Sequence, residues 1–155
     1  MKYLLLGLLM LTIATNVSAN TNRDLVNQTL DALHHNASVA DFDAYFSLYH
    51  DSAVFIGTDA SEVWNKEAFK AYAKPHFDKG KGWTYHPRDR HVYFSPDNNV
   101  AWFDELLDNK GLGETRGTGV LIKVGRDWKL TQYHLTIPIP NALAGAVADQ
   151  VRAMQ

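Results

Sequence analysis

Residues 114–137, ETRGTGVLIKVGRDWKLTQYHLTI, are typical of two β-strands joined by a tight turn at residues 125–127. Apolar and polar side chains alternate on both sides of this turn, and a period of two predicts strands with one buried face. Trp128 and Leu130 mark the buried face of the second strand, whereas Lys129 should face water. The sequence therefore predicts a long antiparallel hairpin near the end of the chain.

The chain upstream of this hairpin changes from strands to helices. Period-two alternation predicts two more strands over residues 83–95 and 100–108. Apolar residues at helical spacing predict helices over 23–36, 37–53 and 66–77, with Asp41 and either Ser61 or Asn65 as N-caps, and a short strand over 53–57. Helices followed by a meander of antiparallel strands indicate the α+β class, with the helices packed on one face of a curved sheet. Such a concave face keeps a hollow that helices do not fill.

The first residues have the pattern of a secretory signal peptide. A positively charged start at Met1 and Lys2 precedes an apolar run over residues 3–14 and the small residues Val-Ser-Ala at 17–19. We expect a signal peptide over residues 1–19, a domain over 20–141 and a helical tail over 142–155, which places the protein in the periplasm or outside the cell. The alternative is an uncleaved membrane anchor; no later segment is long and apolar enough to span a membrane.

Composition excludes several classes of function. The chain contains no cysteine, so thiol catalysis and cysteine-ligated zinc are excluded. Its formal net charge is −2, which does not favour binding to nucleic acid. The seven histidines have no recognisable metal-ligand spacing, and no phosphate-binding loop is present. We expect no metal, no cofactor and no nucleic-acid partner.

Polar residues interrupt the predicted inward faces of the hairpin. A three-residue turn pairs Val124 with Trp128 and sets Thr118 opposite His134. If the even-numbered residues face inward, the polar inward residues are Arg116, Thr118, Gln132 and His134. The preceding strand then sets either Asp104 or Glu105 against Arg116, since a buried arginine needs a carboxylate partner. This cluster is interpreted as a structural ion pair, as a group that orients a ligand, or as an acid–base site.

Several segments resemble the SnoaL-like branch of the NTF2-like superfamily. The segments are FIGTDASEVW, AWFDELLDN, RGTGVLIKVGRDWKL and IPIPN, and the resemblance runs from about Leu25 to Asn141. It implies a cone of N-terminal helices against a curved, mixed sheet, with a pocket between them and frequent dimerisation. The superfamily includes isomerases, cyclases, dehydratases and binding domains, so the resemblance alone does not identify a reaction.

The resemblance also directs attention to residues 57–64, GTDASEVW. Related isomerases place a carboxylate base near this region, which makes Asp59 or Glu62 a candidate for abstracting a proton next to a carbonyl group. The simpler interpretation is that Asp59 and Ser61 are turn and N-cap residues. Trp64 is expected to form a wall of the hollow.

Three hypotheses of function follow. The first is a pocket that binds a small, mostly apolar molecule with one polar end. The second is an isomerase, dehydratase or hydrolase that uses Asp59, Glu62 or His134 as a general base. The third is an interaction module that forms a homodimer and binds no ligand.

Overall fold

The computed structural model describes residues 21–154; the predicted signal peptide over residues 1–19 lies outside this part of the chain. The helices are an N-terminal helix over residues 21–38, α2 (Phe42–Ser47), α3 (Lys66–Phe77) and α4 (Asn141–Met154). The strands are β1 (Tyr49–Ile56), β2 (Val63–Asn65), β3 (His86–Phe94), β4 (Val100–Asn109), β5 (Gly113–Val124) and β6 (Asp127–Thr136).

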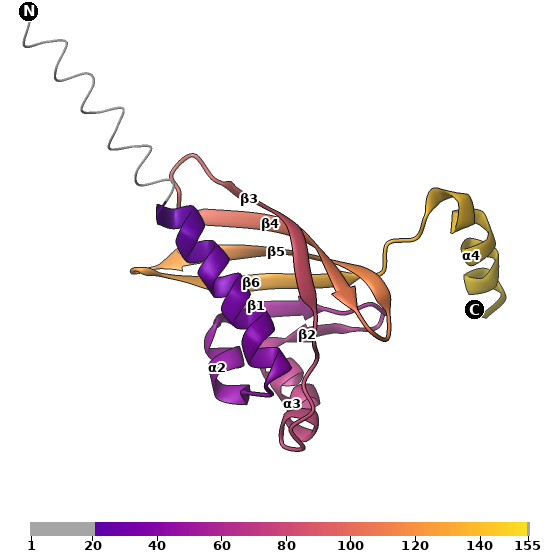
Figure 1. Ribbon diagram of the computed structural model, residues 1–155, viewed down its shortest axis with the longest axis horizontal. Helices are drawn as coiled ribbons and strands as arrows, with labels where there is room; N and C mark the ends of the chain where they lie inside the picture. Colours follow the sequence, from indigo (N-terminus) through magenta and orange to yellow (C-terminus); the bar gives the residue numbers. More distant parts are fainter. Residues whose placement is uncertain (1–20, 155) are drawn as a thin grey trace, which may run out of the picture.

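The six strands form one mixed sheet in the order β2-β1-β6-β5-β4-β3. Strand β1 pairs in parallel with β6, and the other neighbouring pairs are antiparallel. The N-terminal helix, α2 and α3 lie against one face of this curved sheet (Figure 1). The α+β prediction is therefore confirmed.

The helices begin where their capping residues predict. The Asp41 side chain accepts a hydrogen bond from the backbone N–H of Ala44 and caps α2, and Asn65 caps α3 in the same way through Ala68. The predicted helix over 37–53 was wrong in its second half, because β1 begins at Tyr49 and pairs with β6.

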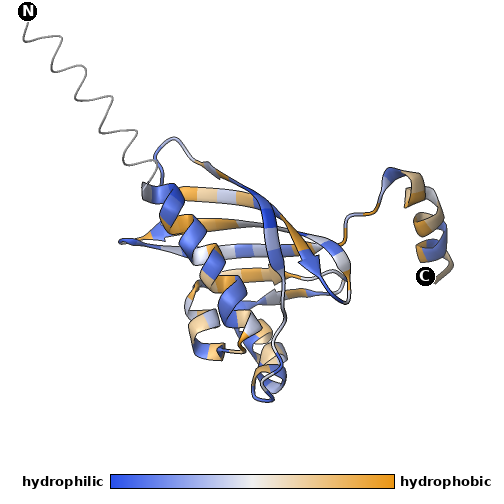
Figure 2. Cartoon of the chain, in the orientation of Figure 1, coloured by the Kyte–Doolittle hydropathy of each residue, from blue (hydrophilic) through white to orange (hydrophobic). Residues whose placement is uncertain are grey.

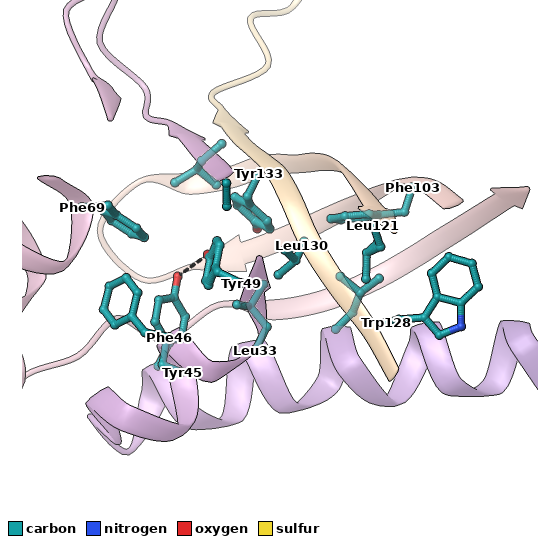
Figure 3. Packing of buried hydrophobic residues seen from close by; sticks show 14 of the residues in the cluster. Leu33, Tyr45, Phe46, Tyr49, Phe69, Phe103, Leu121, Trp128, Leu130 and Tyr133 are labelled. Carbon is teal, nitrogen blue, oxygen red and sulfur yellow. Dashed lines mark hydrogen bonds between the residues drawn. The ribbon is translucent and has the colours of Figure 1, made fainter. Parts of the chain in front are cut away.

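The main core lies between the helices and the inner face of the sheet. The N-terminal helix contributes the buried residues Val26, Leu30, Leu33 and Ala37, which recur at helical spacing. Figure 2 shows mostly hydrophilic residues along the outward side of this helix. The opposite side therefore packs on the sheet, and the close-up of the core shows Leu33 among the buried aromatic rings (Figure 3).

The turn between β5 and β6 differs from the prediction. It has two residues, because Val124 pairs with Asp127, and Gly125 adopts a positive φ of 65°. The register then shifts between the pairs Leu121–Leu130 and Val120–Gln132, which leaves Thr131 as an extra residue in a β-bulge. The predicted pairing of Thr118 with His134 is confirmed, because the shorter turn and the bulge compensate for each other.

The bulge also reverses which residues of β6 face the core. Trp128 and Leu130 are buried before the bulge, and Tyr133 and Leu135 are buried after it. On β5 the odd-numbered residues are buried, namely Thr115, Gly117, Gly119 and Leu121. The expected inward orientation of Arg116, Thr118, Gln132 and His134 was therefore wrong; these four lie on the outer face of the sheet.

The C-terminal helix α4 stands apart from the sheet (Figure 1) and has no buried residue. Residues 137–140, Ile-Pro-Ile-Pro, connect it to β6. Among residues 21–154, no helix has the length and apolar character needed to cross a membrane.

Candidate functional site

A cavity of about 220 Å³ lies between the helical layer and the inner face of the sheet. The N-terminal helix, α3 and strands β1, β2 and β6 contribute to its lining. The apolar lining residues are Leu33, Ala37, Phe55, Trp64, Phe69, Trp83, Leu112 and Leu135, and the other lining residues are His34, Tyr45, Gly57, Thr58, Glu62, Tyr72, Tyr85 and Tyr133. Thr58, Tyr72 and Leu112 are exposed, so they mark the side that opens to solvent.

His34 belongs to a chain of linked polar and charged side chains that borders this pocket and runs from the buried Glu105 to the exposed Asp31. Its Nε2 atom lies 2.6 Å from Oε1 of Glu105, whose side chain is fully buried in β4. The other oxygen of Glu105 accepts a hydrogen bond of 2.7 Å from Nε of Arg90, and Nη1 of Arg90 lies 2.8 Å from Asp31. Arg90 and its hydrogen bonds compensate the buried carboxylate of Glu105, which would otherwise be costly.

Local backbone structure places these groups together. The register of β3 shifts between Arg88 and His91, where Asp89 adopts a positive φ of 49°. Such a bulge changes the direction of the side chains that follow, and it turns Arg90 towards Glu105 and the N-terminal helix. His34 follows Leu30 by four positions and therefore lies on the buried side of its helix.

The hydrogen bond to Glu105 determines which nitrogen of His34 remains available. Because a carboxylate oxygen accepts, Nε2 carries the proton in this pair. Nδ1 has no hydrogen-bond partner within residues 21–154. In the neutral ring Nδ1 is an acceptor, so His34 offers a hydrogen-bond acceptor beside the pocket.

Tyr133 supplies a second polar group to the pocket. The residue is 5% exposed, and its hydroxyl has no hydrogen-bond partner in the part of the chain that the structure describes. The hydroxyl lies over Gly117, where a β-carbon would come within 2.6 Å of the Tyr133 oxygen and 3.3 Å of Oε1 of Glu105. Burial, and then the charge of Glu105, raise the pKa of Tyr133, so the hydroxyl stays protonated and can donate.

Tyr45 and Tyr49 form a separate hydrogen-bonded pair next to the pocket. Their hydroxyl oxygens lie 2.8 Å apart (Figure 3), and burial raises the pKa of both groups above the ordinary value of 10.0. Tyr45 also borders the pocket, but its hydroxyl is already satisfied by Tyr49. Of the buried polar side chains in the lining, His34 and Tyr133 therefore keep hydrogen-bonding capacity for a ligand.

Some of the predicted site residues lie at the pocket and others do not. Trp64 and Glu62 line it, as the sequence suggested for Trp64. Glu105 faces inward and pairs with an arginine, but that arginine is Arg90. Asp59 is exposed in the loop before β2, where its side chain accepts hydrogen bonds from the backbone N–H and the hydroxyl of Ser61. These hydrogen bonds lower the pKa of Asp59, as in an ordinary turn.

Arg116 has no carboxylate opposite it. It pairs in register with Leu106, whereas Asp104 and Glu105 of β4 lie opposite Thr118 and Gly117. Asp104 faces outward and lies 3.2 Å from the exposed His91. The expected ion pair of Arg116 with Asp104 or Glu105 was therefore wrong, and a role in ligand binding for Arg116, Asp104, Thr118, Gln132 and His134 on the outer face stays a prediction.

The sequence analysis missed His34, Arg90 and Tyr133. His34 carried a usable signal, because it continues the apolar stripe of the N-terminal helix four positions after Leu30. Tyr133 and Leu135 are two positions apart, so they lie on one face of the strand, and Gln132 and His134 lie on the other. Arg90 had no such signal, since its direction depends on the bulge in β3.

Within residues 21–154, no group of three or more histidine, aspartate or glutamate side chains is arranged to hold a metal ion. The expectations of no metal and no cofactor stay predictions.

Comparison with known proteins identifies the family. Residues 26–140 match the model of the SnoaL-like domain. No curated protein matches the sequence.

Solved structures share the fold at low sequence identity. A candidate scytalone dehydratase from Novosphingobium aromaticivorans DSM 12444 is similar with a TM-score of 0.68 at 10% identity, covering 80% of this chain and 89% of that one. A candidate dehydratase of the NTF2-like family from Streptomyces avermitilis gives 0.66 at 13% identity, covering 78% and 99%. An NTF2-like protein with a cystatin-like fold from Novosphingobium aromaticivorans gives 0.65 at 11%, covering 86% and 93%. At these identities the similarity establishes the fold alone.

Proposed function

The chain belongs to the SnoaL-like domain family, and on this premise we propose that its pocket binds a small, mostly apolar molecule with one polar end. The observation that carries the proposal is the cavity of about 220 Å³ beside His34 Nδ1 and the Tyr133 hydroxyl, two polar groups with no hydrogen-bond partner among residues 21–154. Both groups can therefore form a hydrogen bond with a ligand or a water in the cavity.

The lining fits this description of the ligand. Aromatic and aliphatic side chains form most of the wall, and His34 and Tyr133 supply polar groups beside Glu105. Pockets for drug-sized ligands usually have volumes of about 300–1,000 Å³. A cavity of about 220 Å³ therefore suits a smaller molecule of one or two rings.

A variant that obstructs the open side of the pocket tests the proposal. Thr58 is exposed and lines the pocket, so Thr58→Trp should block entry with little effect on the fold. Val63→Trp is the matched control, because Val63 is 60% exposed, lies in the same segment and is not a lining residue. The probes are 2-naphthol and 2-methylnaphthalene, titrated by calorimetry. We expect binding to the wild type and to Val63→Trp and at least about a tenfold loss in Thr58→Trp, which is about 1.4 kcal/mol. Equal binding to both variants would contradict the proposal.

A second function is favoured by the pair of His34 and Glu105. A histidine held by a carboxylate is a suitable general base, and Tyr133 can donate a hydrogen bond to an oxygen that gains negative charge. His34 Nδ1 would take a proton from the carbon next to a carbonyl group while Tyr133 stabilises the enolate oxygen. Return of that proton to another carbon completes an isomerisation. In this version His34 takes the place of Asp59, which is exposed in a turn, and of His134, which lies on the outer face; Glu62 also lines the pocket and stays a candidate base.

Proton exchange measures this activity without knowledge of the natural substrate. The protein is incubated with 2-tetralone in deuterated water, and the loss of the proton signals next to the carbonyl group is followed by NMR. General-base catalysis contributes about 10²–10⁴-fold in rate, so His34→Asn should reduce the protein-dependent exchange by that factor. His134→Asn is the matched control and should leave exchange unchanged. Exchange that is no faster with the wild type than in buffer would exclude this function for the probe and leave the binding function standing.

A further inference from the structure

We propose that two copies of this chain associate by exchanging their C-terminal helices, so that α4 of each copy packs on the outer face of the other copy's sheet. The inference is independent of the pocket and of any ligand. It rests on two apolar surfaces that the described chain leaves uncovered, and on the linker that precedes α4. This helix follows the residues 26–140 that match the SnoaL-like domain, so it is an addition to that domain.

One side of α4 is apolar and uncovered. Its larger apolar side chains recur at helical spacing, and we call them the α4 stripe: Leu143, Val147, Val151 and Met154. Leu143 is 53% exposed, Met154 is 88% exposed, and no residue of the helix is buried. Twelve large apolar residues are exposed among residues 21–154, and five of these lie in residues 137–154. This concentration indicates a surface that packs on another surface.

A helix of this kind has little stability by itself. It has 14 residues, and isolated helices shorter than about 12–15 residues are marginal in water. Gly145 and the β-branched Val147 and Val151 lower its helix propensity further. Most helical stability in proteins comes from packing of the apolar side. The α4 stripe therefore requires a surface that covers it.

The outer face of the sheet offers such a surface over β3, β4 and β5. Cross-strand pairing sets Tyr93 beside Trp102, and their stacked rings lie 5.9 Å apart and are each nearly half exposed. The N-terminal helix, α2 and α3 lie against the opposite face (Figure 1). A sheet face that is open to water is normally polar, so apolar residues on this one indicate that it is covered. They form the outer apolar patch: Tyr93, Val100, Trp102, Leu106, Val120 and Ile122.

The helix and the outer apolar patch match in size. A helix of 14 residues is about 21 Å long. Val100 and Leu106 are six positions apart on β4, which is about 20 Å along a strand. The three strands β3, β4 and β5 span about 10 Å between the outer two, close to the diameter of a helix. Ala144 and Ala148 flank the stripe, and their small side chains allow close approach to the large rings of the patch.

The linker keeps α4 away from its own sheet. Residues 137–140 are Ile-Pro-Ile-Pro and contain no turn. Ile137 and Ile139 each precede a proline, which disfavours helical backbone at both positions. A tight turn centred on Pro138 and Ile139 would need near-helical backbone or a positive φ at Ile139, and a β-branched residue before proline rarely adopts either. The linker therefore runs extended over about 12 Å, and α4 stands apart from the sheet (Figure 1).

A second copy is the partner that covers both surfaces at once. The stripe and the patch belong to the same chain, so a two-fold exchange buries two stripes on two patches in one closed dimer. A membrane surface fits less well. The charged side chains of α4 are Asp149 and Arg152, which pair with each other, so the helix has no excess of basic residues to attract anionic lipid.

Sedimentation equilibrium of the full chain and its variants tests the exchange. We expect the wild type to dimerise. Val151→Asp places a charge in the stripe and Trp102→Asp places one in the patch, and each should raise the dissociation constant of the dimer about a hundredfold or more, because that charge would be buried without a partner. Ala153→Asp is the matched control, because Ala153 is exposed on α4 outside the stripe, and it should leave the dimer unchanged. Both test positions are exposed in the single copy, so the variants should keep its fold, which circular dichroism checks.

Three outcomes would overturn the proposal. The first is a wild type that stays monomeric. The second is a dimer that Trp102→Asp weakens and Val151→Asp does not, because the two sheets would then pack directly on each other. The third is binding of the wild type to vesicles of anionic phospholipid that Val151→Asp abolishes, which would assign the stripe to a membrane surface.

Cross-linking with conservative substitutions locates the contact. The chain has no cysteine, so single cysteines can be introduced without background. A copy with Val147→Cys is mixed with a tagged copy that carries Val120→Cys, and a bis-maleimide reagent links cysteines that lie close together. We expect a cross-link between these two copies. Val39→Cys is the matched control for Val120→Cys, because Val39 is 57% exposed and follows the N-terminal helix on the other side of the sheet. Equal cross-linking to Val39→Cys, or cross-links only between two copies of Val147→Cys, would refute the seating of α4 on the patch.

Discussion

The Nε2 atom of His34 lies 2.6 Å from Oε1 of Glu105, across a separation of 71 positions in the sequence. This contact joins the N-terminal helix to the middle of the sheet. Glu105 also binds Arg90, and Arg90 binds Asp31 on the N-terminal helix. His34, which lines the pocket, therefore belongs to the network that holds this helix against the sheet. Changes in this network should therefore affect both stability and the pocket.

Substitution of Arg90 and of Arg116 should have very different effects on stability. Arg90→Ala leaves the fully buried carboxylate of Glu105 without its cation, and breaking a buried pair costs about 3–5 kcal/mol. Arg116→Ala removes an exposed side chain, and such changes usually stay within about ±0.5 kcal/mol. Urea unfolding of both variants measures the difference. A large loss in Arg116→Ala together with a small loss in Arg90→Ala would restore the pairing expected from the sequence.

Stability should fall steeply in strong alkali. Burial raises the pKa of Tyr45, Tyr49 and Tyr133 above the ordinary value of 10.0. Above about pH 10 the unfolded chain loses these protons while the folded chain keeps them, so the free energy of unfolding falls as pH rises. Each such tyrosine contributes a slope of about 1.4 kcal/mol per pH unit in that range. Urea unfolding at a series of alkaline pH values should show a shallower slope in Tyr133→Phe; an identical slope would mean that Tyr133 ionises in the folded protein.

Gly117 leaves the space that the Tyr133 hydroxyl occupies. A β-carbon at this position would come within 2.6 Å of that oxygen, so Gly117→Ala should destabilise the fold by about 1–3 kcal/mol through overpacking. The cost should be smaller in a Tyr133→Phe background, where the clashing atom is absent. A double-mutant cycle measures this coupling. Additive effects of the two substitutions would show that the hydroxyl does not lie over Gly117.

Export is a prediction from residues 1–19 alone. The charged start, the apolar run and the small residues at 17–19 predict cleavage before Asn20. Mass spectrometry of the protein from the periplasm or the medium should give an N-terminus near this residue. An intact Met1 in a soluble cytoplasmic pool would contradict it.

Much of the fold followed from local signals in the sequence. The N-caps Asp41 and Asn65 marked the starts of α2 and α3, and the alternation of apolar residues identified strands β3 to β6. The faces of β6 were assigned wrongly beyond Thr131, because one extra residue in a strand moves every later side chain to the opposite face. A bulge of this kind depends on pairing between strands, and the local alternation around Thr131 does not indicate it.

The type of polar cluster at the site could be predicted from the sequence, but most of the residues that form it could not. A buried arginine–carboxylate pair beside a histidine was expected, and Glu105 is part of it. Its partners Arg90 and His34 come from β3 and from the N-terminal helix, and their meeting depends on how the helix crosses the sheet. The way the helix crosses the sheet is a tertiary property, and residue spacing within one segment does not predict it.

If ligands bind at the inner face of the sheet, NMR can locate them there. Isotope-labelled protein is saturated with unlabelled 2-naphthol, and nuclear Overhauser effects between ligand and protein protons are recorded. We predict contacts from the naphthol ring to the ring protons of Phe55 and Tyr133, which line the pocket, and none to the stacked pair of Tyr93 and Trp102 on the outer face. Contacts to Tyr93 and Trp102, with none to Phe55 and Tyr133, would contradict the account.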